Sequence, residues 1–393
     1  MASKVWRHYL PELFALGFSR LHPSLVTVNL TRHCNQQCIY CEIGTGLVPT
    51  GDDLLTVADL KWIIDEMARH HIPRLALCGG EPFLFKGLAD IVAYAGERKI
   101  RCFITSNGMT AFSLGETEMG ILKSCHARVN ISVDSFRDEI NTMTRGNPAA
   151  LTNAIRSIQA LSDRGIPVTV LTVVTKFNFR DLSSFIQTAD RKGIRQVLFQ
   201  PVIACSNYPE CSPADDKVLL NVPYDEMSAL MGQLSEIRRY ENHHRIRTNV
   251  YRILPWVGSY LKWAPDKGKQ MFFREFLKDF YCRDAYAIVD ISYDGLIQPC
   301  GLLPGSLSVS GAPAEGLLPL WKKATRELHE RLEEGDYPPA CNACCHHFSR
   351  NMIASVIRRP LANRATLFRL FPLITVRLFH SVYKTIFIDH AKR

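Results

Sequence analysis

Three cysteines lie close together near the start of the chain, and their spacing fits the binding of an iron–sulfur cluster. Cys34, Cys38 and Cys41 form the pattern Cys-x3-Cys-x2-Cys, here named the cysteine triplet. Such clusters are usually held by four thiolates, and no fourth cysteine follows at a short, regular spacing. The pattern therefore predicts a cubane cluster bound at three corners, with one iron open to a ligand that is not protein.

The cysteine triplet follows a segment with the character of a buried strand. Residues 25–30 are mostly apolar and β-branched, which favours a strand. We therefore expect the triplet just beyond the carboxyl end of a first strand, where α/β folds place their chemistry. A structural zinc site is the alternative. Zinc sites usually combine two Cys or Cys/His pairs, and no second pair lies nearby.

The cysteine triplet resembles the signature of the radical SAM superfamily, in which an aromatic residue precedes the last cysteine. Tyr40 occupies that position here. The resemblance implies that the open iron of a [4Fe-4S] cluster binds S-adenosylmethionine (SAM). One electron would then release methionine and a 5′-deoxyadenosyl radical, which takes a hydrogen atom from a substrate. The flat face of Tyr40 is suited to packing against the adenine.

A second motif of the superfamily follows the next predicted strand, residues 75–78. Gly79, Gly80, Glu81 and Pro82 resemble the GGEP motif, which binds the amino group of the SAM methionine in that superfamily. Glycine allows the backbone to approach a ligand closely, and a carboxylate accepts hydrogen bonds from an ammonium group. We therefore expect this segment to bind the methionine end of SAM.

Two later predicted strands also end in motifs of the superfamily. Residues 101–105 lead into residues 106–108, similar to a Thr-Asn-Gly turn near the ribose. Residues 129–134 resemble the fourth-strand pattern, and the resemblance implies that Ser132 and Arg145 serve the ribose and the carboxylate of SAM. Each motif alone also fits an ordinary turn, but their order is that of the superfamily. The implied SAM-binding residues are Tyr40, Gly79, Gly80, Glu81, Ser106, Asn107, Ser132 and Arg145.

The first half of the chain alternates between predicted strands and helices. Residues 168–174 and 196–200 are the fifth and sixth predicted strands. Residues 56–68, which begin with a capping-box pattern, and residues 149–161 have helical periodicity. This alternation predicts an α/β fold with a parallel sheet. By resemblance, the fold is the partial (β/α)6 barrel of the superfamily, with its active site at the carboxyl ends of the strands.

A second group of cysteines predicts another cluster. Cys282 and Cys300 enclose a predicted hairpin with a tight Asp-Gly turn. A predicted helix over residues 314–332 then leads towards Cys341 and Cys344. We expect these four thiolates to meet around an auxiliary [4Fe-4S] cluster that has no open site.

This second pattern resembles the twitch domain, the short form of the SPASM extension of radical SAM enzymes. The Cys-x12-Gly-x4-Cys element over residues 282–300 matches both forms, and no cysteine follows Cys345. The resemblance therefore implies one auxiliary cluster. Cys345 is the alternative to Cys344 as the fourth ligand, and His346 and His347 are either ligands or solvent-facing residues. A redox-inert zinc ribbon is the alternative for the whole site.

Length and composition agree with a folded enzyme of several parts. The chain has 393 residues, 47% of them hydrophobic, and thirteen cysteines without a recognisable secretory signal. A reducing cytoplasm suits thiolate-bound clusters. The predicted parts are an N-terminal helical segment (1–22), the core barrel (23–220), a helical linker (221–281), the auxiliary cluster domain (282–348) and a basic amphipathic helical tail (349–393).

Most of the net charge of +9 comes from that tail. After Cys345 there are nine Lys and Arg residues against one Asp, which leaves +8 there and +1 for the rest. The tail is also strongly apolar, but no uninterrupted run approaches the ~20 residues of a membrane-spanning helix. Two interpretations remain open: a helix on the inner face of a membrane, and helices packed on the barrel. We expect no nucleic-acid binding, because no groove-reading module is visible.

The resemblance predicts a class of reaction but not a substrate. Auxiliary clusters accompany oxidation and bond formation in related enzymes, so we expect one of these, with a flavodoxin or ferredoxin as electron donor. The chain ends 48 residues after Cys345, which leaves little room for a peptide-binding domain. A small-molecule or lipid-like substrate is therefore favoured. The alternatives are a peptide maturase and a non-catalytic iron–sulfur or zinc scaffold.

Overall fold

The fold is built on one curved sheet, seen in a computed structural model that describes residues 22–48, 55–202, 222–250 and 282–338. The sheet has nine strands in the order β6-β5-β4-β3-β2-β1-β7-β8-β9. The strands are β1 (Leu25–Asn29), β2 (Arg74–Cys78), β3 (Arg101–Ser106), β4 (Arg128–Ser132), β5 (Val168–Val174), β6 (Val197–Pro201), β7 (Ile288–Ile291), β8 (Leu296–Gln298) and β9 (Leu307–Ser308). Neighbours from β1 to β6 are parallel, which confirms the predicted α/β fold with a parallel core.

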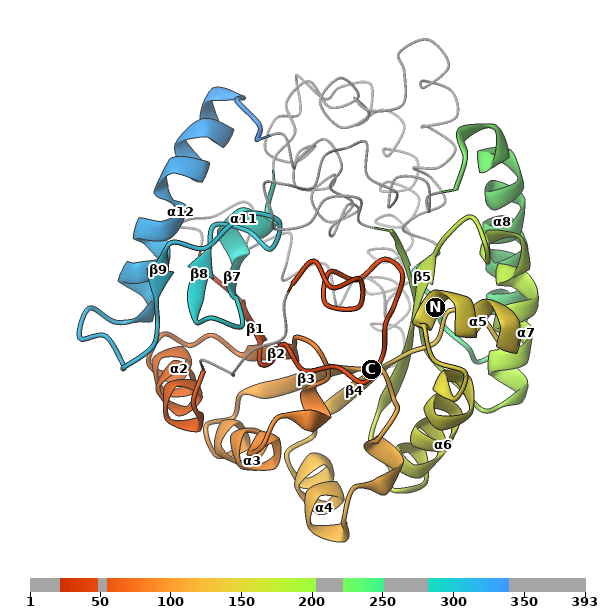
Figure 1. Cartoon of the computed structure of the whole chain (residues 1–393), viewed down its shortest axis with the longest axis horizontal. Coiled ribbons are helices and arrows are strands. Elements are labelled where there is room, and N and C mark those ends of the chain that lie inside the picture. The colour runs from red at the N-terminus through yellow and green to blue at the C-terminus, as the bar shows by residue number, and fades with distance from the viewer. Residues whose placement is uncertain (1–21, 49–54, 203–221, 251–281, 339–393) are drawn as a thin grey trace, which may run out of the picture.

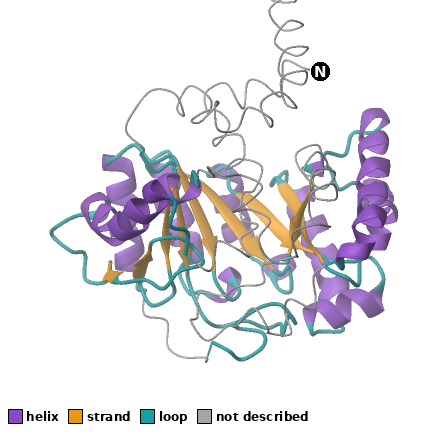
Figure 2. Ribbon diagram, turned by 90° about the horizontal axis from the view of Figure 1, so that it is seen from above, coloured by secondary structure: helices purple, strands orange, loops and turns teal. Residues whose placement is uncertain are grey.

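Helices connect the parallel strands and lie along the outside of the sheet (Figures 1 and 2). The α-helices of the described residues are α2 (Val57–Arg69), α3 (Leu88–Glu97), α4 (Glu116–Ser124), α5 (Asp138–Arg145), α6 (Ala150–Asp163), α7 (Leu182–Arg191), α8 (Met227–His243), α11 (Asp284–Ala287) and α12 (Leu317–Glu334). In the same ranges, short 3-10 helices cover Pro82–Leu84, Ala111–Ser113, Phe179–Asp181 and Tyr224–Glu226. The helices predicted over residues 56–68, 149–161 and 314–332 correspond to α2, α6 and α12.

Alternation along the strands explains which face of the sheet the helices cover. In β1, Val26 and Val28 are fully buried, whereas Thr27 between them is only half-buried. The buried set belongs to one continuous apolar core that also contains Ile63 and Ile64 of α2. Because successive side chains point to opposite faces, the other face of the sheet is left for less buried residues.

A capping box of two residues fixes the start of helix α2. The side chain of Thr56 accepts a hydrogen bond from the backbone of Asp59, and the Asp59 carboxylate accepts one from the Thr56 backbone. This reciprocal pair is the predicted capping box, and it satisfies two donors that the helix itself leaves unpaired.

The later part of the chain extends the barrel sheet. Strand β7 pairs in parallel with β1, with Leu25 opposite Ile288, and β8 then returns antiparallel to β7. The predicted hairpin is therefore present, with Gly295 at a φ of +75° in its turn. Its pairing with the first strand is a feature that the sequence analysis did not predict.

Helix α12 is fixed to this extension and to α2. Trp321, which is 2% exposed, donates from Nε1 to the backbone oxygen of Ile288 at 3.1 Å. At the start of α12, the Leu317 amide donates to the Glu66 carboxylate of α2 at 2.8 Å. The extension and the barrel thus share polar contacts as well as a sheet.

Several predictions fall on segments that the structure does not describe. These are the N-terminal helical segment, most of the helical linker and the basic tail with its predicted membrane contact. The predicted domain boundaries accordingly remain predictions. Within the described ranges, no helix combines the length and apolar composition needed to cross a bilayer.

Candidate functional site

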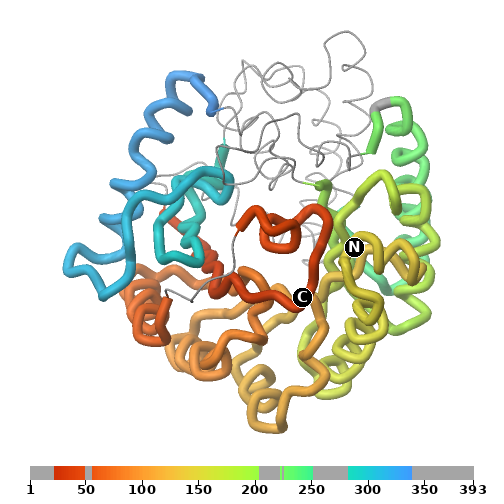
Figure 3. Tube along the Cα trace, in the orientation of Figure 1, coloured from red at the N-terminus to blue at the C-terminus, as the bar shows by residue number. Residues whose placement is uncertain are grey.

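The cysteine triplet lies on a loop, residues 34–41, that follows β1 and is named here the cysteine loop. Figure 3 shows it in red near the middle of the molecule, inside the curve of the sheet. Cys38 is 8% exposed, and Cys34 and Cys41 are half-buried. The sequence analysis expected the triplet beyond the carboxyl end of the first strand, and it lies there.

Glycines after β2 allow the backbone to approach the segment that leads into the cysteine loop. A Cβ on Gly80 would lie 2.1 Å from the backbone oxygen of His33. A Cβ on Gly79, whose φ is +122°, would lie 2.8 Å from that of Thr31. The Gly80 amide donates to the Thr31 oxygen at 2.7 Å. The glycines thus allow close backbone contact within the chain, and their predicted contact with SAM remains a prediction.

Glu81 links the ends of β2 and β3. Its carboxylate is fully buried and accepts from the Phe83 amide at 3.0 Å, the Ser106 hydroxyl at 2.8 Å and the Asn107 amide at 2.7 Å. Desolvation raises the pKa of this carboxyl, and the three hydrogen bonds partly offset that effect. Glu81 therefore fixes the position of Ser106 and Asn107 directly after β3. Its predicted contact with the SAM amino group remains a prediction.

Asn107 reaches from the end of β3 to the cysteine loop. Its Nδ2 donates to Asn35 Oδ1 at 2.7 Å and lies 3.6 Å from the sulfur of Cys34. Its Oδ1 accepts from the Met109 amide at 2.9 Å, which fixes the orientation of the carboxamide. The structure thus places Asn107 against a predicted cluster ligand.

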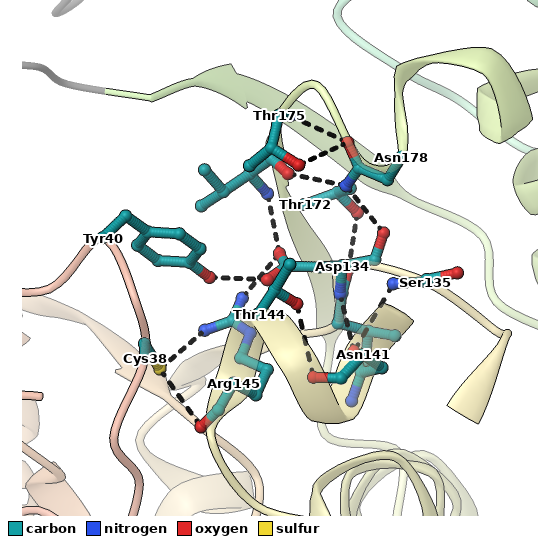
Figure 4. Close-up of polar contacts among 12 residues, drawn as sticks. Cys38, Tyr40, Asp134, Ser135, Asn141, Thr144, Arg145, Thr172, Thr175 and Asn178 are labelled. Carbon is teal, nitrogen blue, oxygen red and sulfur yellow. Dashed lines mark hydrogen bonds and ion pairs between the residues drawn. The ribbon is translucent and has the colours of Figure 1, made fainter. Parts of the chain in front are cut away.

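Arg145, at the end of α5, also approaches the cysteine loop (Figure 4). Its Nη1 lies 3.9 Å from the Cys38 sulfur, and its backbone oxygen lies 3.8 Å from the same sulfur. The next residue, Gly146, has a φ of +66°, and a Cβ there would lie 2.2 Å from the backbone oxygen of Gln37. The end of α5 therefore contacts the cysteine loop directly.

Asp134, after β4, joins these groups into one buried network (Figure 4). Its carboxylate pairs with Arg145 Nη2 at 2.9 Å and accepts from the Tyr40 hydroxyl at 2.6 Å and the Val173 amide at 3.0 Å. The Asp134 side chain is 0% exposed and that of Arg145 is 7% exposed. The backbone oxygen of Asp134 accepts from Asn178 Nδ2 at 2.9 Å. The network connects the cysteine loop to β4, β5 and α5.

The sequence analysis quoted Asp134 within a strand motif but gave it no role. A carboxylate at the end of a buried strand was the available signal, together with an arginine eleven positions later. Ser132, which was predicted to contact SAM, lies half-buried at the end of β4. The ring of Tyr40, predicted to face adenine, has its centroid 5.6 Å from the guanidinium of Arg145.

Burial governs the protonation of these side chains. Desolvation raises the pKa of the Cys34 thiol and raises that of Cys38 to about 11. Desolvation likewise raises the pKa of Tyr40. Burial alone would lower the pKa of Arg145, but Asp134 and other neighbours raise it overall, so the guanidinium stays charged. Iron binds thiolates, so cluster binding here must displace protons that the protein alone retains.

The residues present fit a cluster held by three thiolates. Gln36, which is 4% exposed, accepts from the Cys38 thiol through Oε1 at 3.6 Å. Its Nε2 is buried and has no hydrogen-bond partner among the described residues. A buried donor without a partner is costly, and the sulfurs of a cluster and of its thiolate ligands are acceptors for it. Within the described part of the chain, no three His, Cys, Asp or Glu residues are arranged to share a single metal ion.

The second predicted site is described only in part. Cys282 and Cys300 both pack against a small apolar cluster formed by Ala285, Tyr286, Leu328 and Leu332. The Cys300 sulfur accepts from the Leu302 amide at 3.4 Å. Cys341, Cys344 and Cys345 lie outside the described residues. The four-cysteine auxiliary site therefore remains a prediction, with two of its members on the same apolar cluster.

Comparison with known proteins identifies the class of domain. Residues 28–189 match the sequence model of the radical SAM superfamily. This range begins within β1 and contains the cysteine loop, Glu81, Asp134 and Arg145. The chain therefore contains a radical SAM superfamily domain.

Three relatives show which proteins the chain is similar to. It is 29% identical over 190 residues to the Fe-coproporphyrin III synthase of Methanosarcina barkeri, covering 48% of this chain and 46% of that protein. It is 23% identical over 329 residues to the AdoMet-dependent heme synthase of Nitratidesulfovibrio vulgaris, covering 82% and 85%. It is 24% identical over 303 residues to the sporulation killing factor maturation protein SkfB of Bacillus subtilis, covering 74% and 65%.

A solved structure shares the fold. The chain aligns with native anSMEcpe with bound AdoMet at a TM-score of 0.59 and 14% identity, covering 84% of this chain and 88% of that one. At this identity the likeness concerns the fold alone. It agrees with the predicted α/β core.

Proposed function

We propose that this protein is a radical SAM enzyme that binds a [4Fe-4S] cluster through the cysteine triplet. When bound, the cluster and SAM supply reductive cleavage to methionine and a 5′-deoxyadenosyl radical, which removes a hydrogen atom from the substrate. The observation that carries the proposal is the position of the cysteine loop. It lies inside the curved sheet, within the residues that match the radical SAM superfamily, and Asn107 and Arg145 each approach one of its sulfurs.

The SAM site is proposed on the residues around this loop. Gly79, Gly80 and Glu81 form the turn after β2, and Ser106 and Asn107 are hydrogen-bonded to that turn. We assign these residues to the methionine and ribose parts of SAM. The role of the protein here is to orient the cofactor and to exclude water from the open iron.

Three further residues complete the proposed SAM site. Ser132 lies at the end of β4, two residues before Asp134, whose partners are Tyr40 and Arg145. We assign Ser132 to the ribose and Tyr40 to the adenine. Arg145 already forms an ion pair with Asp134, so a SAM carboxylate would be a second anion on the same guanidinium.

A small molecule is the preferred substrate. The similarity to the heme synthase covers more than four fifths of both chains, and another relative is named for Fe-coproporphyrin III. We propose oxidation or bond formation on a small metabolite, with an iron porphyrin as the first compound to test. A flavodoxin or ferredoxin is the proposed electron donor. The lipid-like variant depends on the basic tail, which lies outside the described residues.

A peptide maturase is the second candidate. The observation that favours it is the similarity to SkfB, which covers 74% of this chain. In either case we propose that Cys282, Cys300, Cys341 and Cys344 hold an auxiliary [4Fe-4S] cluster. Its proposed role is to accept an electron from the oxidised substrate.

Anaerobic reconstitution with iron, sulfide, SAM and dithionite tests the proposal. The wild-type protein is expected to release 5′-deoxyadenosine. Cys38→Ala is expected to abolish release, while Cys125→Ala, which changes a half-buried cysteine outside both patterns, is expected to leave it unchanged. Absence of 5′-deoxyadenosine from a fully reconstituted wild-type protein would contradict the proposal and favour a non-catalytic scaffold.

The same assay separates the two substrate classes. Fe-coproporphyrin III is added in one arm, and peptides encoded next to the gene are added in the other. A porphyrin substrate is expected to increase 5′-deoxyadenosine release and to change in mass. If only a peptide has these effects, the small-molecule proposal is wrong and the maturase proposal stands.

A further inference from the structure

Two sulfurs of the cysteine triplet face side-chain N–H donors that come from separate elements. Asn107 Nδ2, after β3, lies 3.6 Å from Cys34 Sγ, and Arg145 Nη1, at the end of α5, lies 3.9 Å from Cys38 Sγ. Both donors are buried, with Asn107 8% and Arg145 6% exposed. The resemblance to known enzymes assigned these residues to the ribose and the carboxylate of SAM, not to the sulfurs.

We propose that Asn107, Arg145 and Gln36 donate hydrogen bonds to the sulfurs of the cysteine ligands. These hydrogen bonds raise the reduction potential of the cluster. The inference rests on the proposed function, because it requires a cluster on the cysteine triplet. Reduction adds one negative charge to the cluster and its thiolates. Donors aimed at the sulfurs, and a fixed positive charge beside them, stabilise the reduced form more than the oxidised form.

The geometry of Asn107 leaves its donor little freedom. Its backbone amide is held by Glu81, its Oδ1 by Met109 and one proton of Nδ2 by Asn35. The second proton of Nδ2 is the one that faces the sulfur of Cys34. Because the three other contacts are already made, ordering this donor costs little when the cluster binds.

Arg145 is held in the same way by Asp134. The carboxylate fixes Nη2 at 2.9 Å and leaves Nη1 beside the sulfur of Cys38. Asp134 is itself fixed by Tyr40 and the Val173 amide. Because the pair is buried, both charges act on the cluster with little screening by water. Arg145 therefore raises the potential, and Asp134 moderates that effect.

Gln36 provides the independent observation. Its Oε1 accepts from the Cys38 thiol, and its buried Nε2 has no partner in the described part of the chain. Cys38 bound to iron is a thiolate and has no proton to donate. Rotating the carboxamide end for end then turns Nε2 towards the sulfur and gives the buried donor an acceptor.

The test is a reductive titration of the reconstituted full chain, followed by electron paramagnetic resonance. The signal that changes when SAM is added belongs to the cluster with an open iron. Arg145→Gln and Asn107→Ala are each expected to make reduction about tenfold harder, which is 59 mV for a one-electron couple. Arg145→Lys keeps the charge and is expected to shift the potential less than Arg145→Gln.

Two further variants test the direction of the shift in potential and provide a control. Asp134→Asn removes the moderating charge and is expected to shift the potential in the opposite direction, towards easier reduction. Arg137→Gln changes an exposed arginine just before α5, which pairs with Glu139 and Asp181, and is expected to leave the potential unchanged.

Gln36→Leu keeps the inference testable if the ion-pair variants fail to fold. The leucine side chain is similar in shape to that of glutamine but lacks the carboxamide. This variant is expected to lower the reduction potential. Unchanged potentials in Gln36→Leu and Asn107→Ala, with normal iron content, would overturn the inference. A wild-type protein that assembles no SAM-sensitive cluster would instead overturn the proposed function.

Discussion

At the scale of single residues, a glycine at the end of α5 allows the backbone to approach the cysteine loop closely. The carbonyl of Gln37 occupies the place where a side chain on Gly146 would begin. The loop backbone is fixed at the same place by the amide of Ile39, which donates to the Thr144 oxygen at 3.1 Å. A three-thiolate site needs this rigidity, because a ligand that drifts by an ångström loses its iron.

We expect Gly146→Ala to reduce both stability and iron binding. Alanine is strained by roughly 1–2 kcal/mol at this left-handed position. Its Cβ would also lie 2.2 Å from the Gln37 oxygen, so the loop must move. Overpacking of this kind adds about 1–3 kcal/mol. Urea unfolding of the apo-protein and iron content after reconstitution are the measurements.

Gly165→Ala is the matched control. Gly165 has a φ of +76°, close to that of Gly146, but a Cβ there meets nothing within 4 Å. It carries the same backbone strain without the close approach. We expect this variant to be less stable than the wild type only by the energy of the backbone strain, and to keep its full iron content. Equal effects of the two substitutions would show that the contact with Gln37 is unimportant.

Buried thiols outside the triplet predict how the apo-protein responds to alkaline pH. Desolvation raises the pKa of Cys102 in β3 from 9.0 to about 12. Below pH 9 the folded and unfolded states both hold this proton. Between pH 9 and about 12 only the folded state holds it, so rising pH favours unfolding.

We therefore expect the wild type to lose stability relative to Cys102→Ala as pH rises. Over the two units from pH 9 to pH 11, the difference in unfolding free energy should change by about 2.3 kcal/mol. Urea unfolding of both apo-proteins at pH 8, 9, 10 and 11 measures it, and other titrating groups cancel in the comparison. A difference that is constant with pH would mean that this thiol ionises as easily in the folded state.

At the scale of elements, α2 joins the barrel to the extension through two carboxylates on its inner side. Asp59 completes the capping box and also accepts from the Gly311 amide at 2.8 Å. Glu66 is 1% exposed, accepts from the Leu317 amide at the start of α12 and forms an ion pair with Arg69. A helix has unpaired amides in its first turn, and Glu66 satisfies one of those of α12 from a neighbouring element.

We expect Glu66→Ala to loosen α12 against the barrel. The buried Leu317 amide would lose its acceptor, which costs about 1–3 kcal/mol. Glu66→Gln keeps an oxygen acceptor at the same place, so it is expected to retain most of the stability. Hydrogen exchange of the amides in α12 and the melting temperature are the measurements. If glutamine is as damaging as alanine, the charge and not the Leu317 hydrogen bond holds the helix.

At the scale of the whole molecule, local patterns predicted the elements but not how distant ones meet. The strands from β1 to β6, and the capping box of α2, follow from periodicity and from single side-chain preferences. The pairing of β7 with β1 joins Leu25 to Ile288, and no local pattern records such a contact. The cysteine loop was placed correctly because its strand was. The Asp134 network was missed because it forms only when β4, β5, α5 and the loop come together.

The iron content of the whole chain is the last prediction. Two [4Fe-4S] clusters correspond to about eight iron atoms per chain. Replacing the cysteine triplet by alanine is expected to leave about four, held by the auxiliary site. Replacing Cys282 and Cys300 by alanine is expected to leave the other four, and with them the spectral response to SAM. Metal analysis with Mössbauer spectroscopy of both variants measures these numbers. Zinc in place of iron in the triplet variant would establish a zinc ribbon at the second site. In that case the sheet extension through β7 anchors a structural metal, and the electron from an oxidised substrate must leave by another route.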